Sequence, residues 1–280
     1  LSLNIFFFST TKVEANAFDI SDIEISKPFE INFDKNQVID EGFEKAFLKL
    51  ILLIVNSSDQ KKIEGTRLNQ IKGMVESFSI KEEKFIDENY NVVLGVSFNK
   101  LKVFKYLENK NIFPSIPIEK KVLFIPVLID ESKKELLVFS NNLIFDEWNN
   151  FLKEFHLLEY VLPTEDLEDI NILQNRYETI ENYDFEEIIS KYNLKDSIVA
   201  LIFKNENKVR ILSKISINNE VILKNQTFPN INIENKIEAE NIINKLKITY
   251  EDYWKNFNQI NTSIRLPLKI KISNSNNSKV

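Results

Sequence analysis

The chain has 280 residues and contains no cysteine, one histidine and only four glycines. The lack of cysteine excludes disulfides, thiolate nucleophiles and cysteine-ligated metal centres. One histidine is too few for a histidine-based zinc site. Four glycines leave no room for a phosphate-binding loop or a dinucleotide-binding fingerprint. We therefore expect no cofactor, no bound metal and no catalytic residue that the sequence can name.

Basic residues are also in the minority. The formal net charge is −6, with a pI of about 5.2, which argues against a nucleic-acid partner. Hydrophobic residues make up 43% of the chain and charged residues 28%, as in an ordinary globular protein of one large or two small domains. Apolar runs are too short for an integral membrane span in the mature chain. Scarce Ala, Gly and Arg beside abundant Ile, Asn and Lys indicate an AT-rich bacterial genome.

The first residues resemble an export signal. The chain starts at Leu1 rather than Met, so we expect that its extreme N-terminus is missing. A short apolar stretch up to Phe8 is followed by Ala15-Asn16-Ala17, the pattern of a secretory signal peptide. We predict that residues 1–17 are the remnant of a signal peptide cleaved before Phe18, and that the protein is periplasmic or peripheral to the membrane. The alternative is the first strand of a cytosolic domain.

Hydrophobic periodicity predicts an N-terminal α+β domain over residues 18–116. Alternating or helical spacing of apolar residues indicates each element. Asp34 followed by Gln37 is typical of a capping box at a helix start, and Pro114 with Pro117 indicates a domain boundary. The predicted elements are a strand at 22–33, a helix from Asp34 to Val55, a hairpin of 74–86 and 90–98 around Asp87-Glu88-Asn89, and a short helix at 101–107.

A second α+β domain is predicted over residues 118–260. Its first strand, 122–129, is apolar enough to be central, but Pro126 within it suggests a bulge or an edge. The fold class is α+β: two small mixed α/β sandwich-type domains with mostly antiparallel sheets. The other predicted elements are a strand at 136–139, a helix at 144–158, a strand at 160–162, a helix at 185–192, strands at 197–203, 208–217 and 220–228, and a long amphipathic helix at 239–257.

Residues 261–280 are predicted to form a terminal strand and a polar tail. Apolar side chains alternate with polar ones from Ile264 to Ile272, so the strand needs an apolar partner and a neighbouring strand. We expect it to pair with an edge of the second-domain sheet. The alternative is that it begins a further domain.

The densest acidic segment is the loop from Leu162 to Asp169. Thr164 or Asp166 followed by acidic residues is typical of a helix cap that also complements the helix dipole. Pro163, Asp166 and Asp169 are also candidates for a partner-binding loop. Paired carboxylates could in addition bind a divalent cation or act as acid and base, but the spacing is not that of a calcium loop.

Two other segments carry candidate chemistry. His156 is the only histidine, and we interpret it as a partly exposed residue of the 144–158 helix, because no nucleophile motif accompanies it. The aromatic segment from Tyr250 to Phe257 could line a carbohydrate or peptide groove. Its helical spacing favours packing in the core instead.

Taken in order, these features resemble a family of exported bacterial proteins of unknown function, DUF2066, over roughly residues 20–260. The chain differs from it where Lys120-Lys121 replace an Arg-Pro pair and where a Trp near Ser115 is absent. The resemblance implies export and a non-enzymatic or unknown role, and it supplies no catalytic residues. It rests on the opening strand and helix from Ile23 to Val55, on Val92–Phe98 followed by Leu107 and Phe113-Pro114, on Val122–Val127, and on Leu162-Pro163 with Asp166 and Asp169.

Two functional hypotheses follow. The first is a periplasmic, non-enzymatic accessory or interaction protein whose partner is another envelope protein. In that case the 162–169 loop and the sheet edges are the expected contacts. The second is a cell-envelope hydrolase that uses the acidic loop around Asp166. The lack of a recognisable nucleophile or metal-binding motif favours the first.

Overall fold

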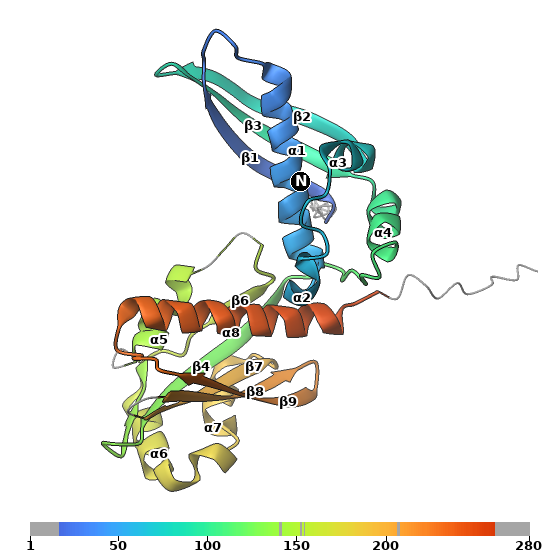
Figure 1. Ribbon diagram of the computed structural model, residues 1–280. Coiled ribbons are helices and arrows are strands. Elements are labelled where there is room, and N and C mark those ends of the chain that lie inside the picture. The colour runs from blue at the N-terminus through green and yellow to red at the C-terminus, as the bar shows by residue number, and fades with distance from the viewer. Residues whose placement is uncertain (1–16, 140–141, 152, 154, 206–207, 261–280) are drawn as a thin grey trace, which may run out of the picture.

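The computed structural model describes residues 17–139, 142–151, 153, 155–205 and 208–260 (Figure 1). Most of the predicted signal segment, residues 1–16, and the predicted terminal strand, 264–272, lie outside these residues. Helices and strands are mixed throughout the described chain, which confirms the α+β class. Within the described ranges, no helix combines the length and the apolar character that a membrane span requires.

The N-terminal region is an antiparallel sheet with the strand order β1-β3-β2. The long helix α1 lies across one face of this sheet (Figure 1). The elements are β1 (Asp19–Pro28), α1 (Lys35–Ile54), α2 (Ser57–Gln60), α3 (Leu68–Met74), β2 (Val75–Ile86), β3 (Asn89–Phe98) and α4 (Lys100–Glu108).

Local sequence signals explain most of these elements. The side chain of Asp34 caps α1 by accepting a hydrogen bond from the backbone N–H of Asn36 at 2.8 Å. The hairpin between β2 and β3 turns at Asp87 and Glu88, whose φ angles are +49° and +59°. Two consecutive positive φ angles match the twist of the flanking strands. The predicted helix and hairpin are therefore confirmed.

The first strand is shorter than its sequence predicts. It ends at Pro28, whereas alternating apolar residues continue to Phe33. Pro28 pairs with Asn89, the first residue of β3, so no residue of β3 remains for the following residues to pair with. Phe29 and Ile31 lie beyond the end of the ladder and are exposed.

The C-terminal region is a mixed sheet with the strand order β5-β4-β7-β8-β9, in which β6 also pairs with β4. The pairs β4–β6 and β4–β7 are parallel and the others antiparallel. Helix α8 covers one face, and α6 and α7 lie on the other (Figure 1). The elements are β4 (Lys120–Asp130), β5 (Glu135–Leu137), α5 (Leu143–Glu147), η2 (Trp148–Phe151), β6 (Leu158–Val161), α6 (Leu167–Asn175), η3 (Tyr177–Asn182), α7 (Glu186–Ile189), η4 (Ser190–Tyr192), β7 (Ser197–Asn205), β8 (Lys208–Ile217), β9 (Glu220–Pro229) and α8 (Lys236–Phe257).

Pro126 is accommodated in a gap beside the central strand β4. The N–H of Leu123 points toward β7, so even-numbered residues of β4 point their N–H groups to the opposite side. On that side β6 pairs only with residues 120–123, and β5 only with 128–130. The missing donor of Pro126 therefore falls where no strand is paired, and its carbonyl accepts a hydrogen bond from Asn142 Nδ2 at 3.2 Å. The strand is central, but it is an edge locally.

The predicted helix at 144–158 is wrong beyond its first turns. α5 ends at Glu147 and a 3₁₀ turn, η2, at Phe151, so His156 is not helical but lies in the loop before β6. The apolar residues of this segment follow helical spacing, but Leu158 begins β6 as a parallel neighbour of β4. Pairing with the sheet therefore takes precedence over local periodicity.

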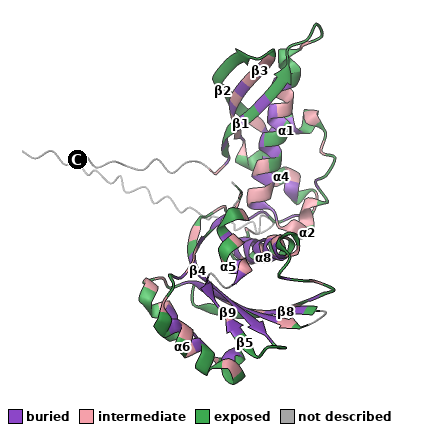
Figure 2. Ribbon diagram, turned by 90° about the vertical axis from the view of Figure 1, so that its left-hand side faces the viewer, coloured by how far each residue is buried: buried purple, intermediate pink, exposed green. Residues whose placement is uncertain are grey.

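The hydrophobic cores separate along the chain. One cluster of buried residues runs from Phe18 to Ile112, and two others, one on each face of the C-terminal sheet, lie between Val122 and Trp254. The passage between them, 113–121, contains Pro114 and Pro117, where the sequence predicts the boundary. The central strands β4 and β7 of the C-terminal sheet are buried along most of their length, whereas its edge strand β9 is exposed. Figure 2 shows β4 buried, whereas β2 at the side of the N-terminal sheet is exposed.

Candidate functional site

The acidic loop serves as a helix cap. Asp166 accepts a hydrogen bond from the backbone N–H of Glu168 at 2.9 Å and begins α6, which confirms the predicted cap. Lys191 of η4 binds Asp166 at 2.8 Å and the buried Asp169 at 2.7 Å. These contacts lower the pKa of Asp166 and raise that of Lys191. The two carboxylates therefore join α6 to η4.

This placement limits the loop as a partner-binding surface. Pro163 is buried, and so is Asp169. Of the three residues predicted to contact a partner, only Asp166 reaches the surface. Leu167 beside it is 79% exposed and lies on the outer side of α6. Partner binding by this loop stays a prediction.

The two predicted residues at the cleavage site differ in burial. Ala17 is half-buried, while Phe18 is 3% exposed and packs edge-on against Phe104 with ring centroids 5.5 Å apart. The carbonyl of Phe18 accepts a hydrogen bond from the N–H of Phe98. Phe18 is thus part of the N-terminal core, and Ala15 lies outside the described residues.

The C-terminal half of α8 joins the two regions. Lys255 is 4% exposed, and its Nζ donates to the carbonyls of Leu52 and Val55 at the end of α1. A cation at this position complements both the unpaired last carbonyls and the negative end of the helix dipole. Asp252, one turn earlier, accepts from the N–H of Ser57 at 2.8 Å and so caps α2.

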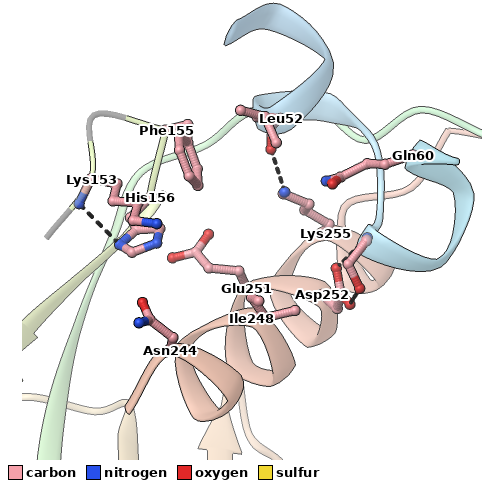
Figure 3. A pocket seen from close by; sticks show the side chains of 11 residues that line it. Leu52, Gln60, Lys153, Phe155, His156, Asn244, Ile248, Glu251, Asp252 and Lys255 are labelled. Carbon is pink, nitrogen blue, oxygen red and sulfur yellow. Dashed lines mark hydrogen bonds between the residues drawn. The ribbon is translucent and has the colours of Figure 1, made fainter. Parts of the chain in front are cut away.

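A cavity of about 170 Å³ lies beside this junction, between α1, α2, α8 and the loop before β6. Figure 3 shows Glu251, His156 and Phe155 turned toward the same space, while Lys255 turns away toward Leu52. The cavity is smaller than the several hundred cubic ångströms of most pockets for drug-sized ligands.

Glu251 is the buried acid of this junction. It is 4% exposed, and its carboxylate accepts hydrogen bonds from the backbone N–H groups of Leu157 at 3.0 Å and Leu158 at 2.9 Å. Burial raises the pKa of Glu251, and these two bonds with the charges of Lys255 and Lys247 partly offset the shift. The carboxylate therefore holds the start of β6 against α8.

His156 stays neutral at physiological pH. Burial lowers its pKa to about 4, and the charges of Lys247 and Lys153 act in the same direction. Its Nδ1 accepts a hydrogen bond from the N–H of Lys153 at 3.3 Å, so the ring proton sits on Nε2. Among the described residues no group of three or more His, Asp or Glu side chains could hold a metal ion.

Lys247 is a further buried charged residue of α8, one turn before Glu251. It is 1% exposed, and its Nζ lies 5.0 Å from the ring centroid of Trp148 and 5.2 Å from that of Tyr160. Within the described chain its ammonium group has no hydrogen-bond partner. Burial lowers the pKa of Lys247 to about 8, although Glu251 one turn away favours the charged form.

The sequence contains a signal for this cluster. Lys247, Glu251 and Lys255 are spaced four residues apart, so they share one face of α8. Their neighbours in the predicted apolar stripe, Leu246 and Tyr250, are fully buried. Charged residues at helical spacing beside a buried stripe indicate a polar network inside the fold. The interpretation of this segment as hydrophobic core alone does not include that network.

A second candidate site is the uncovered side of strand β2. Helix α1 packs mainly against β1 and then β3, and leaves β2 largely bare. Three apolar side chains of β2 therefore stay open to solvent on the helix side of the sheet: Phe78 at 47%, Ile80 at 37% and Phe85 at 61% exposure. We call these three residues the β2 surface.

The β2 surface is continuous with the aromatic core of the N-terminal region. Phe78 packs edge-on against Phe43 of α1, with ring centroids 5.2 Å apart. At the other end of the strand, Phe85 contacts Phe29 and Tyr90, each at 5.1 Å. In the part of the chain that the structure describes, no strand pairs with the outer side of β2. An exposed edge of this length beside apolar side chains is typical of a site for protein contact.

Comparison of the chain with protein-family models and with curated proteins found no match to either.

Proposed function

We propose that the chain is an exported, non-enzymatic interaction protein of the bacterial cell envelope, as its likeness to the DUF2066 family implies. The proposed partner is a protein of the cell envelope that adds an extended segment to strand β2. The signal-like start and the Ala15-Asn16-Ala17 pattern support export. Glu251 and Lys255 bind backbone groups of neighbouring elements, which supports a structural role for these two charged residues.

The observation that carries this proposal is the β2 surface. A strand at a sheet edge offers unpaired N–H and C=O groups to an incoming strand, and its side chains supply specificity. Covering Phe78 and Phe85 would remove apolar area that contributes about 25 cal/mol for each Å² buried. Lys81 and Lys84 on the opposite face make the edge unattractive to unselected strands. One face of β2 therefore offers apolar contact area, and the charged opposite face limits which strands can pair with it.

We expect a photo-crosslinking amino acid at Ser79 of β2 to yield an adduct with a protein segment in living cells. The same residue at Ser26, which is exposed on the opposite edge strand β1, should yield none. Mass spectrometry of the adduct identifies the partner. In purified form that partner should bind the F78S/F85S variant at least about tenfold more weakly than the unmodified protein, since two buried rings would be lost.

The matched control for binding is V221S/L223S. Val221 and Leu223 are 69% and 64% exposed on β9, the edge of the other sheet. This variant should bind as the unmodified protein does. Equal binding by F78S/F85S, or adducts from Ser26 alone, would contradict the proposal.

Export is tested by the N-terminus of the processed protein. When the gene is expressed in a bacterial host, we expect the mature chain to begin at Phe18 and to fractionate with the periplasm. An A17R substitution removes the small residue before the cleavage site and should leave a larger, uncleaved product. N-terminal sequencing that finds an unprocessed chain in the cytosol would refute export. The proposal that the β2 surface binds a partner would be unaffected.

A further inference from the structure

A β-bulge decides how the edge of β2 can be used. Ile80 pairs with Leu94 of β3 and Glu82 with Val93, so Lys81 is an extra residue in the strand. Lys81 and Glu82 therefore both point away from α1, to the face where Lys81 binds Asp22 at 3.0 Å. A second extra residue, Glu76, lies between Val75 and Ser77, and the stretches from Ser77 to Ile80 and from Glu82 to Ile86 alternate normally.

The bulge makes the strand self-complementary when Lys81 lies opposite Glu82 of a second copy. Opposed residues of an antiparallel pair must point to the same face. When β2 is laid against a second β2 with Lys81 opposite Glu82, every pair from Ser77 with Ile86 to Ile80 with Glu83 meets this condition. Shifting the strand by one or two residues in either direction sets helix-side residues against residues of the other face. A larger shift, with Ser79 opposite Ser79, also matches the faces over residues 75–83, because Glu76 is an extra residue as Lys81 is, but it sets Glu76 against Glu82. The register with Lys81 opposite Glu82 matches the faces over the longest overlap, residues 77–86, and sets no two like charges against each other.

This register also matches the side chains. On the helix side, Phe78 of each copy faces Phe85 of the other, so the two exposed rings of the β2 surface cover one another. Ile80 faces Glu83, whose carboxylate is held by Lys35 and Tyr90 of its own copy and leaves its methylene groups to the contact. Aromatic pairs across neighbouring strands are among the most stabilising.

On the opposite face the charges alternate in sign across the contact. Lys81 already binds Asp22, and Glu82 binds Lys84 at 2.7 Å, within one copy. The register sets Lys81 against Glu82 of the second copy, twice by symmetry. The row then reads acid, base, acid, base from one copy into the next, which favours this pairing over a shifted one.

We infer that the partner of the β2 surface is a second copy of this chain, joined antiparallel through β2 with Lys81 opposite Glu82. The inference rests on the proposed function of β2 as a docking edge. The two three-stranded sheets become one continuous sheet, and both α1 helices lie on the same side. The C-terminal region lies beyond the lower end of the N-terminal sheet (Figure 1), so a two-fold axis through the middle of β2 carries the two C-terminal regions to opposite ends.

The absence of cysteine makes the register directly testable. In this arrangement Ser79 opposes Lys84 of the second copy at about 5 Å between Cα atoms, which a disulfide can span. Within one copy the two residues are ~16 Å apart along the strand. The full-length S79C/K84C variant should therefore form a covalent dimer under mild oxidation. Two controls should stay monomeric: S77C/K84C, whose thiols share the same face but are out of register by two residues, and S79C alone, which crosslinks only if Ser79 lies opposite Ser79.

Sedimentation of the purified, uncrosslinked protein supplies the second readout. We expect a concentration-dependent dimer, at least about tenfold weaker in K81E, which sets two acids against each other, and restored in K81E/E82K, which reverses both charges. A monomer at every concentration with no 79–84 crosslink would overturn the inference. If the adduct from Ser79 then holds a different protein, the docking function of β2 stands and only the second copy is wrong. If no adduct forms at all, both the docking function of β2 and the second copy as its partner are contradicted.

Discussion

Replacing Glu251 by alanine should lower the free energy of unfolding by about 4 kcal/mol, as expected when one partner of a buried charged network is removed. The substitution leaves the buried N–H groups of Leu157 and Leu158 without an acceptor. It also removes the negative charge that favours the charged forms of Lys255 and Lys247, one turn away on either side. Urea unfolding at pH 7 measures the loss.

Two further variants separate the causes of this loss. Glu251→Gln keeps the size of the side chain and one acceptor oxygen, so we expect it to lose roughly half as much stability. Glu240→Ala, a half-buried position on the same helix, should change stability by no more than about 0.5 kcal/mol. If Glu251→Ala resembled Glu240→Ala, the carboxylate would not be holding β6 to α8.

In contrast, replacing Lys247 by methionine should raise the free energy of unfolding at pH 7 by about 3 kcal/mol. Burial lowers the pKa of Lys247 from 10.5 to about 8, and lowering a lysine pKa by one disfavours the charged form by about 1.4 kcal/mol. Methionine has a similar length, and when packed against Trp148 and Tyr160 it needs no hydrogen-bond partner. Lys245→Met, exposed on the same helix, is the matched control and should change little.

The pH dependence identifies the cause. Because the pKa of Lys247 is lower in the folded than in the unfolded chain, the unfolded chain binds more protons between pH 8 and 10. The unmodified protein therefore gains stability relative to Lys247→Met as the pH rises from 8 toward 10, and the advantage of the variant shrinks. The comparison cancels contributions shared by both proteins, including those of Tyr160 and Lys255. An advantage that stayed constant from pH 7 to 10 would contradict the assignment.

Local sequence determined the elements whose apolar pattern and turn chemistry agree. Strand β3 alternates from Asn89 to Phe98, and its buried residues are the alternate ones. Helix α8 buries the stripe that its spacing predicts, from Ala239 to Trp254. The turn at Asp87 and Glu88 and the cap at Asp34 are also readable from the sequence, because each depends on residues close in the chain.

The site is less readable, because its members come from distant segments. His156 is conspicuous as the only histidine, but its surroundings depend on α8, about 90 residues away along the chain. Lys247 and Lys255 are the same residue type on one helix face. The first is buried under Trp148 without a hydrogen-bond partner in the described chain, and the second binds the carbonyls of α1. Periodicity reports which face of a helix is covered, and it does not report what covers it.

By itself, the sequence determined the α+β class and excluded cysteine chemistry through its residue types. It also predicted a domain boundary near Pro114 and Pro117. Only the tertiary structure decided where pairing stops and what a helix leaves bare. β1 ends at Pro28 because β3 has no further residue to pair with, and Pro126 fits a central strand because β5 and β6 leave a gap beside it. The β2 surface is open because α1 packs over β1 and β3 instead. Each of these outcomes depends on contacts between residues far apart in the chain, whose energies no local pattern contains.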